Sequence, residues 1–412
     1  MVRWYRGWWR LAGSLMLAVT LVCGASAASY AETLKVGMAL GLSGVAALIG
    51  KSGQTGAEVA VEEVNARGGV MGQHKLELLV RDDKLRPEIG ARELEELILK
   101  EKIQFALGPV SSSVGLAVSE VARKYKIPII THTSNTERQT VERGHRYMFQ
   151  VVPNTFMEGT LAAIRAAEQP WKNYYLIGPD YEYGHSVMDA FKRKIKQLRP
   201  DVEILGEFWP KLGETDFTSY ITAMQAAKPD VMYTTLWGAD QIAFVKQARS
   251  RNFFDAIPMI WLSELDTLRA LGNEMVLGML CHTRAPFYAI DTPEMARFVE
   301  QYKTRTGEYP SDWAILAYDA MSILVQAMEQ AKTTDREKVV EALEQGTFKS
   351  LRGPISFRKE DHMGNVPYYA GVIGKSDKYP FYILTDVKAI PGDKLWRPAE
   401  EIPAIRAAAE KK

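Results

Sequence analysis

The chain has little cysteine, with Cys23 and Cys281 the only two among its 412 residues. Cys23 lies in an amino-terminal stretch that we expect to be removed, so that Cys281 would remain alone. A lone thiol excludes an internal disulfide, and with it the class of small exported domains that depend on disulfide frameworks. A chain of this length can bury ample apolar surface as two domains and needs no such link.

An excess of charge of one sign is also lacking. The chain carries 51 lysine and arginine residues against 50 aspartate and glutamate residues, without long runs of either sign. A near-neutral surface of mixed charge argues against nucleic acid, and against a strongly charged membrane surface, as a partner.

The familiar catalytic signatures are missing as well. The sequence has no G-x-S-x-G elbow, no H-E-x-x-H motif and no C-x-x-C pair. The histidines are scattered along the chain at His74, His132, His145, His185, His282 and His362. Cys281 and His282 are adjacent, but neighbouring strand residues point to opposite faces, which does not suit a shared metal. We therefore expect a binding protein with no cofactor and no metal, and not an enzyme.

The first 31 residues have the composition of a signal peptide. A short basic start, MVRWYRGWWR, precedes the apolar stretch LAGSLMLAVTLVC, which is short for a membrane span. Small residues follow, and either Ala25 with Ala27 or Ser29 with Ala31 fits an A-x-A cleavage site. Export by means of residues 1–31 is the prediction, and a retained membrane anchor is the alternative.

From residue 34 onward, short apolar runs alternate with helical patterns. The first pass contains the runs LKVGMAL, IQFALG and IPIITHT, and the helical segment PEIGARELEELILKE with its proline in the first turn. A second pass begins at NYYLIGPD and continues through DVMYTTLW and IPMIWLS. This alternation predicts an α/β fold of two lobes, each with a parallel central sheet that carries helices on both faces.

Long helical patterns follow residue 285, and the last part of the chain has strand and turn character. No proline- or serine-rich linker separates the passes, so we expect short crossovers that form a hinge. The predicted division places residues 32–150 and about 286–350 in lobe 1, residues 151–285 and about 351–390 in lobe 2, and residues 391–412 in a carboxyl-terminal tail.

The stretch GLSGVAALIGKSG, residues 41–53, raises the question of a phosphate-binding loop. Such a loop requires a glycine, four residues and then Gly-Lys-Ser, because that length wraps backbone N–H groups around phosphates. Here five residues separate Gly44 from Gly50, and all five are apolar. A strand-to-helix turn beside a cleft is the better interpretation.

Open parallel sheets bind ligands beyond the carboxyl ends of their strands, near helix N-termini. Ser111, Ser112 and Ser113 follow IQFALG at a helix start, and Thr133 and Ser134 follow the run IPII. Hydroxyls in such turns either cap the helix or help free N–H groups to hold an anion. Because both turns follow parallel strands, we expect them to face one rim as a carboxylate cradle.

The second pass predicts residues for the opposite rim of the binding cleft. Tyr183 opens a helix after NYYLIGPD, Trp237 ends the run DVMYTTLW, and Glu264 follows IPMIWLS. These residues would supply an aromatic wall and a carboxylate able to pair with a ligand ammonium. For Glu264 the competing interpretation is a helix N-terminal acid that the helix dipole favours.

Together these stretches resemble the type I periplasmic solute-binding proteins of ABC importers, most closely the branched-chain amino-acid (Leu/Ile/Val-binding) family. The most specific stretch is LSGVAALIGKSGQTGAEVAVEEVNARGGVMGQHKLELLVRDDKLRP, with its Ser-Gly in the first loop, its Asn-Ala-x-Gly-Gly-x-x-Gly turn and its Asp-Asp followed by a proline. The stretches GPVSSS, ITHTSNTERQT and DYEYGHS follow in the order of the family's later landmarks.

The resemblance implies a Venus-flytrap protein, monomeric and periplasmic, that binds a small molecule between its lobes and presents it to an ABC permease. The ligand-binding positions that carry over are Ser111, Ser112, Ser113, Thr133, Ser134, Tyr183, Trp237 and Glu264. In the family the serine turn holds the ligand α-carboxylate, and an acidic residue that matches Glu264 meets the ligand ammonium.

Two departures from the family bear on the ligand. Leu48 and Ile49 stand where many members have an aromatic residue, and Leu85 and Ser111 stand where some members have a disulfide. The first departure, together with Trp237, favours a larger apolar or aromatic side chain over leucine, isoleucine or valine. An amino acid is the expected ligand, with an aromatic or other organic carboxylate or an amide as the alternative. A ligand sensor for a signalling system and an exported hydrolase with an unrecognised site also stay open.

Overall fold

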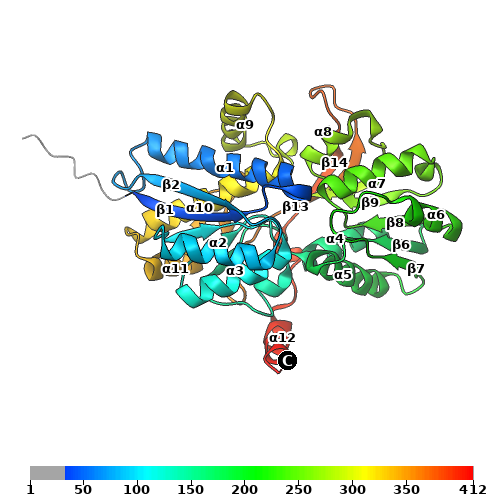
Figure 1. Cartoon of the computed structure of the whole chain (residues 1–412). Coiled ribbons are helices and arrows are strands. Elements are labelled where there is room, and N and C mark those ends of the chain that lie inside the picture. The colour runs from blue at the N-terminus through cyan, green and yellow to red at the C-terminus, as the bar shows by residue number, and fades with distance from the viewer. Residues whose placement is uncertain (1–32, 412) are drawn as a thin grey trace, which may run out of the picture.

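A computed structural model describes residues 33–411, which form two α/β units side by side, each around its own sheet (Figure 1). The predicted signal peptide, residues 1–31, lies outside the described residues. Across residues 33–411, no helix combines the length and the apolar character needed to cross a membrane.

The sheet of the first unit is parallel throughout, with the strand order β2-β1-β3-β4-β5. Its strands are β1 (Leu34–Leu40), β2 (Leu76–Asp82), β3 (Phe105–Leu107), β4 (Ile129–Thr131) and β5 (Met148–Gln150). The strand order reverses at β1, so the carboxyl ends of β1 and β3 border the crevice where such sheets bind ligands.

The sheet of the second unit has the order β14-β13-β10-β9-β8-β6-β7. Its strands are β6 (Asn173–Ile177), β7 (Glu203–Phe208), β8 (Val231–Thr234), β9 (Met259–Leu262), β10 (Leu280–Thr283), β13 (Tyr368–Gly374) and β14 (Ile383–Ile390). Strands β6 to β10 pair in parallel, whereas β13 runs antiparallel to β10 and β14. The predicted α/β fold with parallel central sheets is confirmed.

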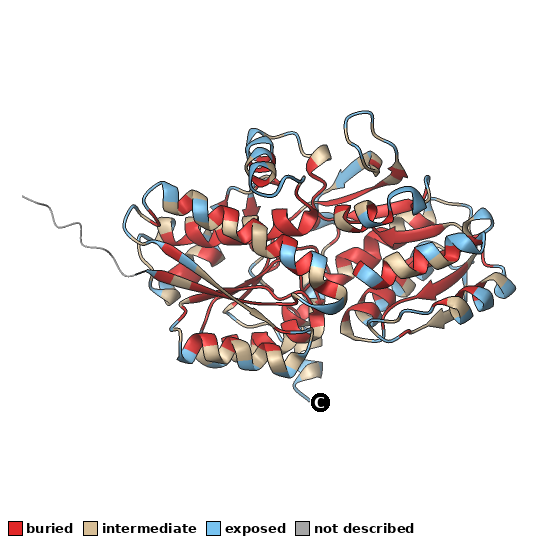
Figure 2. Ribbon diagram, turned by 45° about the horizontal axis from the view of Figure 1, so that its top comes forward, coloured by how far each residue is buried: buried red, intermediate tan, exposed pale blue. Residues whose placement is uncertain are grey.

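Helices cover both faces of each sheet, with their buried sides inward and their exposed sides outward (Figure 2). Around the first sheet lie α1 (Ala47–Ala66), α2 (Pro87–Leu99), α3 (Ser112–Tyr125), α9 (Pro293–Thr306), α10 (Asp312–Ala331) and α11 (Arg336–Gln345). Around the second lie α4 (Thr155–Ala167), α5 (Glu182–Leu198), α6 (Thr218–Ala227), α7 (Gly238–Ser250) and α8 (Leu265–Leu271). The apolar helix α10 packs against α1 at Gly56, where a Cβ would lie 2.0 Å from the carbonyl oxygen of Ala314.

Short elements complete the described chain. The small antiparallel pair consists of β11 (Thr347–Phe348) and β12 (Ile355–Ser356). The 3₁₀ turns are η1 (Gly44–Ala46), η2 (Glu137–Gln139), η3 (Phe253–Asp255), η4 (Gly272–Glu274), η5 (Phe287–Ala289), η6 (Gly392–Lys394) and η7 (Ala399–Glu401). After β14 the chain leaves the second sheet and ends in α12 (Ile402–Ala409) (Figure 1).

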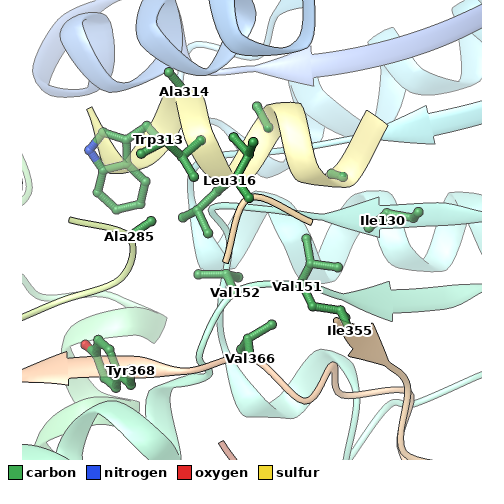
Figure 3. Close-up of a cluster of buried hydrophobic side chains, with 14 of the residues drawn as sticks. Ile130, Val151, Val152, Ala285, Trp313, Ala314, Leu316, Ile355, Val366 and Tyr368 are labelled. Atoms are coloured by element: carbon green, nitrogen blue, oxygen red, sulfur yellow. The ribbon is translucent and has the colours of Figure 1, made fainter. Parts of the chain in front are cut away.

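Three passages of the chain from one unit to the other lie close together. They follow β5, β10 and β12, and their apolar residues share one buried cluster with α10 (Figure 3). Val151, Ala285 and Val366 come from these passages, Ile355 belongs to β12, and Trp313 comes from α10. Because residues far apart in sequence pack here side by side, this cluster holds the two units in contact.

Candidate functional site

A cavity lies between the two units, at the carboxyl ends of their strands. Its empty volume is about 320 Å³, part of which is open to solvent. The lining residues are Ile49, Val110, Ser112, Thr133, Asn135, Tyr181, Tyr183, Trp237, Leu262, Arg284 and Trp313. Both units contribute to the wall, as a cleft between lobes requires.

The serine turn lies at the start of α3. Ser111 is the N-cap residue, but its side chain makes no capping hydrogen bond. The first N–H groups of a helix have no partner within the helix, so at this end they remain available to an anion. Ser112 lines the cavity beside them, whereas Ser111 is buried and Ser113 is half-buried outside the lining.

The second hydroxyl turn follows β4. Thr133 lines the cavity, and its hydroxyl lies 2.8 Å from Nδ1 of His132. Ser134 is fully buried away from the lining, where its hydroxyl donates to Oε1 of Gln139 at 3.0 Å. Asn135, which is not among the predicted residues, lines the cavity in its place.

The predicted aromatic residues of the second unit reach the cavity together. Tyr183, in the first turn of α5, and Trp237, the N-cap residue of α7, are both buried and line the wall. The next residue, Gly238, has φ +55°, and a Cβ there would lie 2.5 Å from the carbonyl oxygen of Val45 in the first unit. Only glycine allows α7 to approach η1 so closely across the cleft.

Glu264 is the N-cap residue of α8 and is 1% exposed, but it is not among the residues that line the cavity. Its Oε1 accepts a hydrogen bond from the Thr267 hydroxyl at 2.9 Å, and its Oε2 is buried without a partner. Burial raises the pKa of Glu264 to about 7, although the Thr267 hydrogen bond and the charge of Arg284 oppose the shift.

Arg284 is the charged residue of the wall, and it is not among the residues predicted from the sequence. It follows β10, is 3% exposed, and donates through Nη2 to Oε2 of Glu158 on α4 at 2.8 Å. Its guanidinium also lies 4.8 Å from the ring centre of Trp313. Burial is the largest single influence and would lower the pKa of Arg284, but Glu158, Tyr368 and Tyr183 together raise the pKa above its ordinary value.

Glu158 is fully engaged by protein donors. Its Oε1 accepts from the Tyr183 hydroxyl at 2.5 Å, and its Oε2 accepts from Asn135 at 3.1 Å as well as from Arg284. Burial, reinforced by Glu158, raises the pKa of Tyr183, so its hydroxyl stays protonated as a donor. Asn135 comes from the first unit and Glu158 from the second, so this network also joins the two units.

The backbone around Arg284 is held by Asp312 at the start of α10. Its Oδ2 accepts hydrogen bonds from the Thr283 hydroxyl and from the N–H groups of Arg284 and Ala285, at 2.5, 2.8 and 2.7 Å. The contact crosses from the second unit to the first. It therefore fixes Arg284 where the chain passes between them.

The wall offers hydrogen-bond donors and no carboxylate. None of the lining residues in the described part of the chain is aspartate or glutamate. The buried donors of the wall without an acceptor in the described part of the chain include Nε of Arg284 and Nε1 of Trp313. Both groups can only donate, so the cavity suits a ligand with acceptor oxygens.

The site was predicted from residues that follow strand ends, and two further wall residues occupy such positions. Arg284 follows the run LCHT as directly as Glu264 follows the preceding strand, and Tyr181 stands two residues before Tyr183. Trp313 lies at a helix start far from either turn, and its place in the wall depends on how α10 packs. Within residues 33–411, histidine, cysteine and acidic side chains form no cluster suited to a metal ion.

Comparisons with known proteins agree with this architecture. The profile of the family described as "Periplasmic binding protein" matches residues 33–378. A leucine-, isoleucine-, valine-, threonine- and alanine-binding protein of Pseudomonas aeruginosa is 23% identical over 358 residues, which cover 86% of this chain and 93% of that protein.

Two solved structures share the fold. A solute-binding protein of an ABC transporter from Rhodopseudomonas palustris, in complex with 3,4-dihydroxybenzoic acid, aligns with a TM-score of 0.78 and 24% identity over 87% of this chain and 97% of that one. The leucine-binding protein LivK from Thermotoga maritima aligns with a TM-score of 0.76 and 24% identity over 86% of this chain and 98% of that one.

The chain belongs to the periplasmic binding protein family. It shares its fold with the solute-binding protein of an ABC transporter described above. The resemblance found in the sequence is thereby confirmed at the level of family and fold.

Proposed function

We propose that this protein binds an organic carboxylate without an amine, with an aromatic acid as the preferred class, and delivers it to an ABC permease without chemical conversion. Two lobes, residues 32–150 with about 286–350 and residues 151–285 with about 351–390, would close around the ligand. Closure follows when the ligand contacts both lobes, because only a difference in affinity shifts an open–closed equilibrium.

The observation that carries this proposal is the charge of the cavity wall. Arg284 lines the cavity, and the acid nearest to it, Glu158, is already bonded to Tyr183, Asn135 and Arg284 itself. A ligand ammonium would meet no unengaged carboxylate in this wall, and its desolvation would be uncompensated. A ligand carboxylate would meet the free donor of Arg284 and the N-terminus of α3.

The remaining wall suits a ring. Trp237, Trp313 and Tyr181 present aromatic surfaces, and Ile49 and Leu262 add apolar surface. Aromatic side chains pack against a ring in offset or edge-to-face geometry with a gain beyond simple burial. Ser112 and Thr133 place hydroxyls at the same cavity, where they can bond the acid group or a ring hydroxyl.

The relatives allow both ligand classes. The Rhodopseudomonas protein was solved with 3,4-dihydroxybenzoic acid, an aromatic acid without an amine. The Pseudomonas protein takes its description from five amino acids. The choice for this chain therefore rests on its own residues.

An amino acid is the second candidate, and Glu264 is the observation in its favour. One oxygen of this buried carboxylate has no partner, as would befit a group that awaits a ligand ammonium. Its side chain would have to turn toward Leu262 and the cavity, giving up the hydrogen bond from Thr267.

Calorimetric titration of the mature protein separates the two candidates. The panel holds benzoate, 4-hydroxybenzoate, 3-phenylpropionate, phenylalanine and leucine, where phenylalanine differs from 3-phenylpropionate by its amine alone. Binding of the plain acids, lost in Arg284→Gln and kept in Glu264→Gln, supports the proposal. Binding of phenylalanine or leucine with no response to the plain acids, lost in Glu264→Gln, would reverse the choice.

A further inference from the structure

The carboxyl-terminal segment after β14 packs against the first unit, beyond residue 378 where the family match ends. Leu395 and Ile402 are each 1% exposed. Arg406 donates through Nε to the carbonyl oxygen of Val141 at 2.9 Å and through Nη2 to that of Thr140 at 3.1 Å. The segment is therefore anchored to the stretch that follows the second hydroxyl turn of the ligand site.

Arg397 is the most deeply engaged charged residue of this segment. It is 6% exposed, and its guanidinium bonds both carboxylate oxygens of Glu137, at 2.5 and 2.8 Å. It also lies over the ring of Phe156, at 4.2 Å from the ring centre. Glu137 begins η2 in the first unit and Phe156 belongs to α4 in the second, so one side chain touches both units.

The residues on either side of Glu137 reach across the cleft. The Thr136 hydroxyl donates to Oε1 of Glu182 at 2.6 Å, and Nη1 of Arg138 donates to Oε2 of Glu182 at 2.7 Å. Glu182 is the first residue of α5 and stands between the two tyrosines that line the cavity. A continuous series of contacts thus leads from the carboxyl-terminal segment to the wall of the ligand site.

We propose that Arg397 is a positioning residue for ligand binding, which acts by occupying Glu137 so that Arg138 stays paired with Glu182 across the cleft. Arg138 is already shared between Glu142 and Glu182. Released from Arg397, the Glu137 carboxylate would lie one residue away from Arg138 and would compete for its charge. The inference rests on the proposed function only in requiring that a ligand bind in this cavity.

A double-mutant cycle that removes each charge tests this mechanism. The variants are Arg397→Gln, Glu137→Gln and the double variant, with 4-hydroxybenzoate as the probe in calorimetric titration. We expect Arg397→Gln to weaken binding roughly 5- to 20-fold, within the usual range of coupling between separate sites. Glu137→Gln should change binding less than about twofold, as for an ordinary charge change away from the ligand. The double variant should return to nearly normal affinity, because the competing carboxylate is gone.

A purely structural role for Arg397 predicts a different pattern. If the side chain mattered only through packing on Phe156 and α12, the double variant would bind as weakly as Arg397→Gln, and the proposal would be overturned. Arg146→Gln is the matched control, since Arg146 makes exposed ion pairs with Glu337 and Glu344 on the first unit alone. It should leave probe affinity unchanged.

Hydrogen–deuterium exchange of the ligand-free protein gives a readout that needs no ligand. Backbone amides of residues 136–142 and 181–186 should exchange faster in Arg397→Gln and return to the wild-type rate in the double variant. Unchanged exchange in Arg397→Gln would overturn the inference. If wild-type protein fails to bind 4-hydroxybenzoate, the proposed ligand class is at fault, and the exchange series still decides the role of Arg397.

Discussion

Arg352 and Arg284 are both buried arginines paired with a buried carboxylate, but only Arg284 lies in the cavity wall. Arg352 bonds Asp319 on α10 at 2.8 Å and the carbonyl oxygen of Val151 at 2.8 Å, and both charged side chains are fully buried. It joins the turn between β11 and β12 to α10 and to the passage that follows β5. Arg284 bonds Glu158 at the same distance but lines the cavity, with Nε lacking an acceptor.

The comparison teaches that burial and pairing alone do not identify a binding residue. Burying an ion pair costs desolvation that the mutual attraction offsets only when the remaining donors are satisfied. Each arginine has one buried donor without an acceptor, Nη1 in Arg352 and Nε in Arg284. Only Arg284 lines the cavity, whereas Arg352 ties chain segments together. Substitution of Arg352 should therefore mainly lower stability, and substitution of Arg284 should mainly lower ligand affinity.

The largest effect on stability is expected at the pair of Arg352 and Asp319. Arg352→Met would leave Asp319 buried without its cation and should lower the free energy of unfolding by roughly 3–5 kcal/mol. Urea unfolding followed by circular dichroism measures this, and any protein that remains folded should keep its probe affinity. A loss below 1 kcal/mol would show that this pair does not secure the contact between the units.

Arg284→Gln should lower ligand affinity more than it lowers stability. The variant loses the charge that we place against the ligand carboxylate, and binding of the acid probe should weaken by roughly 2–5 kcal/mol. Its loss of stability should be smaller than that of Arg352→Met, because Tyr183 and Asn135 still donate to Glu158. Titration and urea unfolding of the two variants side by side show whether the sites separate; equal losses in both measurements for both variants would abolish the distinction.

Glu264 extends the comparison of buried ion pairs to a buried acid that has no bonded cation. Because burial raises its pKa from 4.5 to about 7, the folded protein holds this proton over that interval while the unfolded chain releases it. The group thus stabilises the fold below about pH 4.5, and its contribution is lost as pH rises toward 7, with a limiting slope of about 1.4 kcal/mol per pH unit.

Other buried carboxyl groups with raised pKa values contribute in the same direction, among them Asp83 and Asp266. The decisive measurement is therefore the difference between wild type and Glu264→Gln in urea unfolding at pH 5 and at pH 8. The variant should gain stability relative to wild type on going to pH 8. A pH-independent difference would place the pKa of Glu264 near its ordinary value.

The smallest effect is expected at an exposed pair. Arg199 bonds Asp201 at 2.8 Å on the surface of the second unit. Arg199→Gln should change the free energy of unfolding by less than about 1 kcal/mol, since solvent screens such pairs. A change as large as that of Arg352→Met would mean that burial is not what separates these pairs.

Local chemistry explains why much of this protein could be predicted. The runs after residue 34 alternate with helical patterns, and the run LKVGMAL became β1 as expected. Turns after parallel strands carried Ser112, Thr133, Tyr183 and Trp237, and all four line the cavity. Each of these residues is placed mainly by its own strand and the helix that follows it.

The direction of a side chain in a turn could not be predicted from the sequence. Ser134 and Glu264 follow strand ends within a few residues, as Thr133 does, yet they point into the protein and bond Gln139 and Thr267. Which way a turn residue faces depends on neighbours that are not adjacent in sequence. Their role at the ligand stays a prediction.

The amino-acid sequence by itself determined the α/β alternation, the family and the polar turns at the strand ends, because these follow from short-range patterns of apolar and hydroxyl residues. Only the tertiary structure decided the charge of the cavity. Arg284 and Glu158 are 126 residues apart, and Arg397 and Glu137 are 260 apart. Such pairs form only where the packing of whole helices and sheets brings two charges together and removes the water between them, and no local pattern encodes that event.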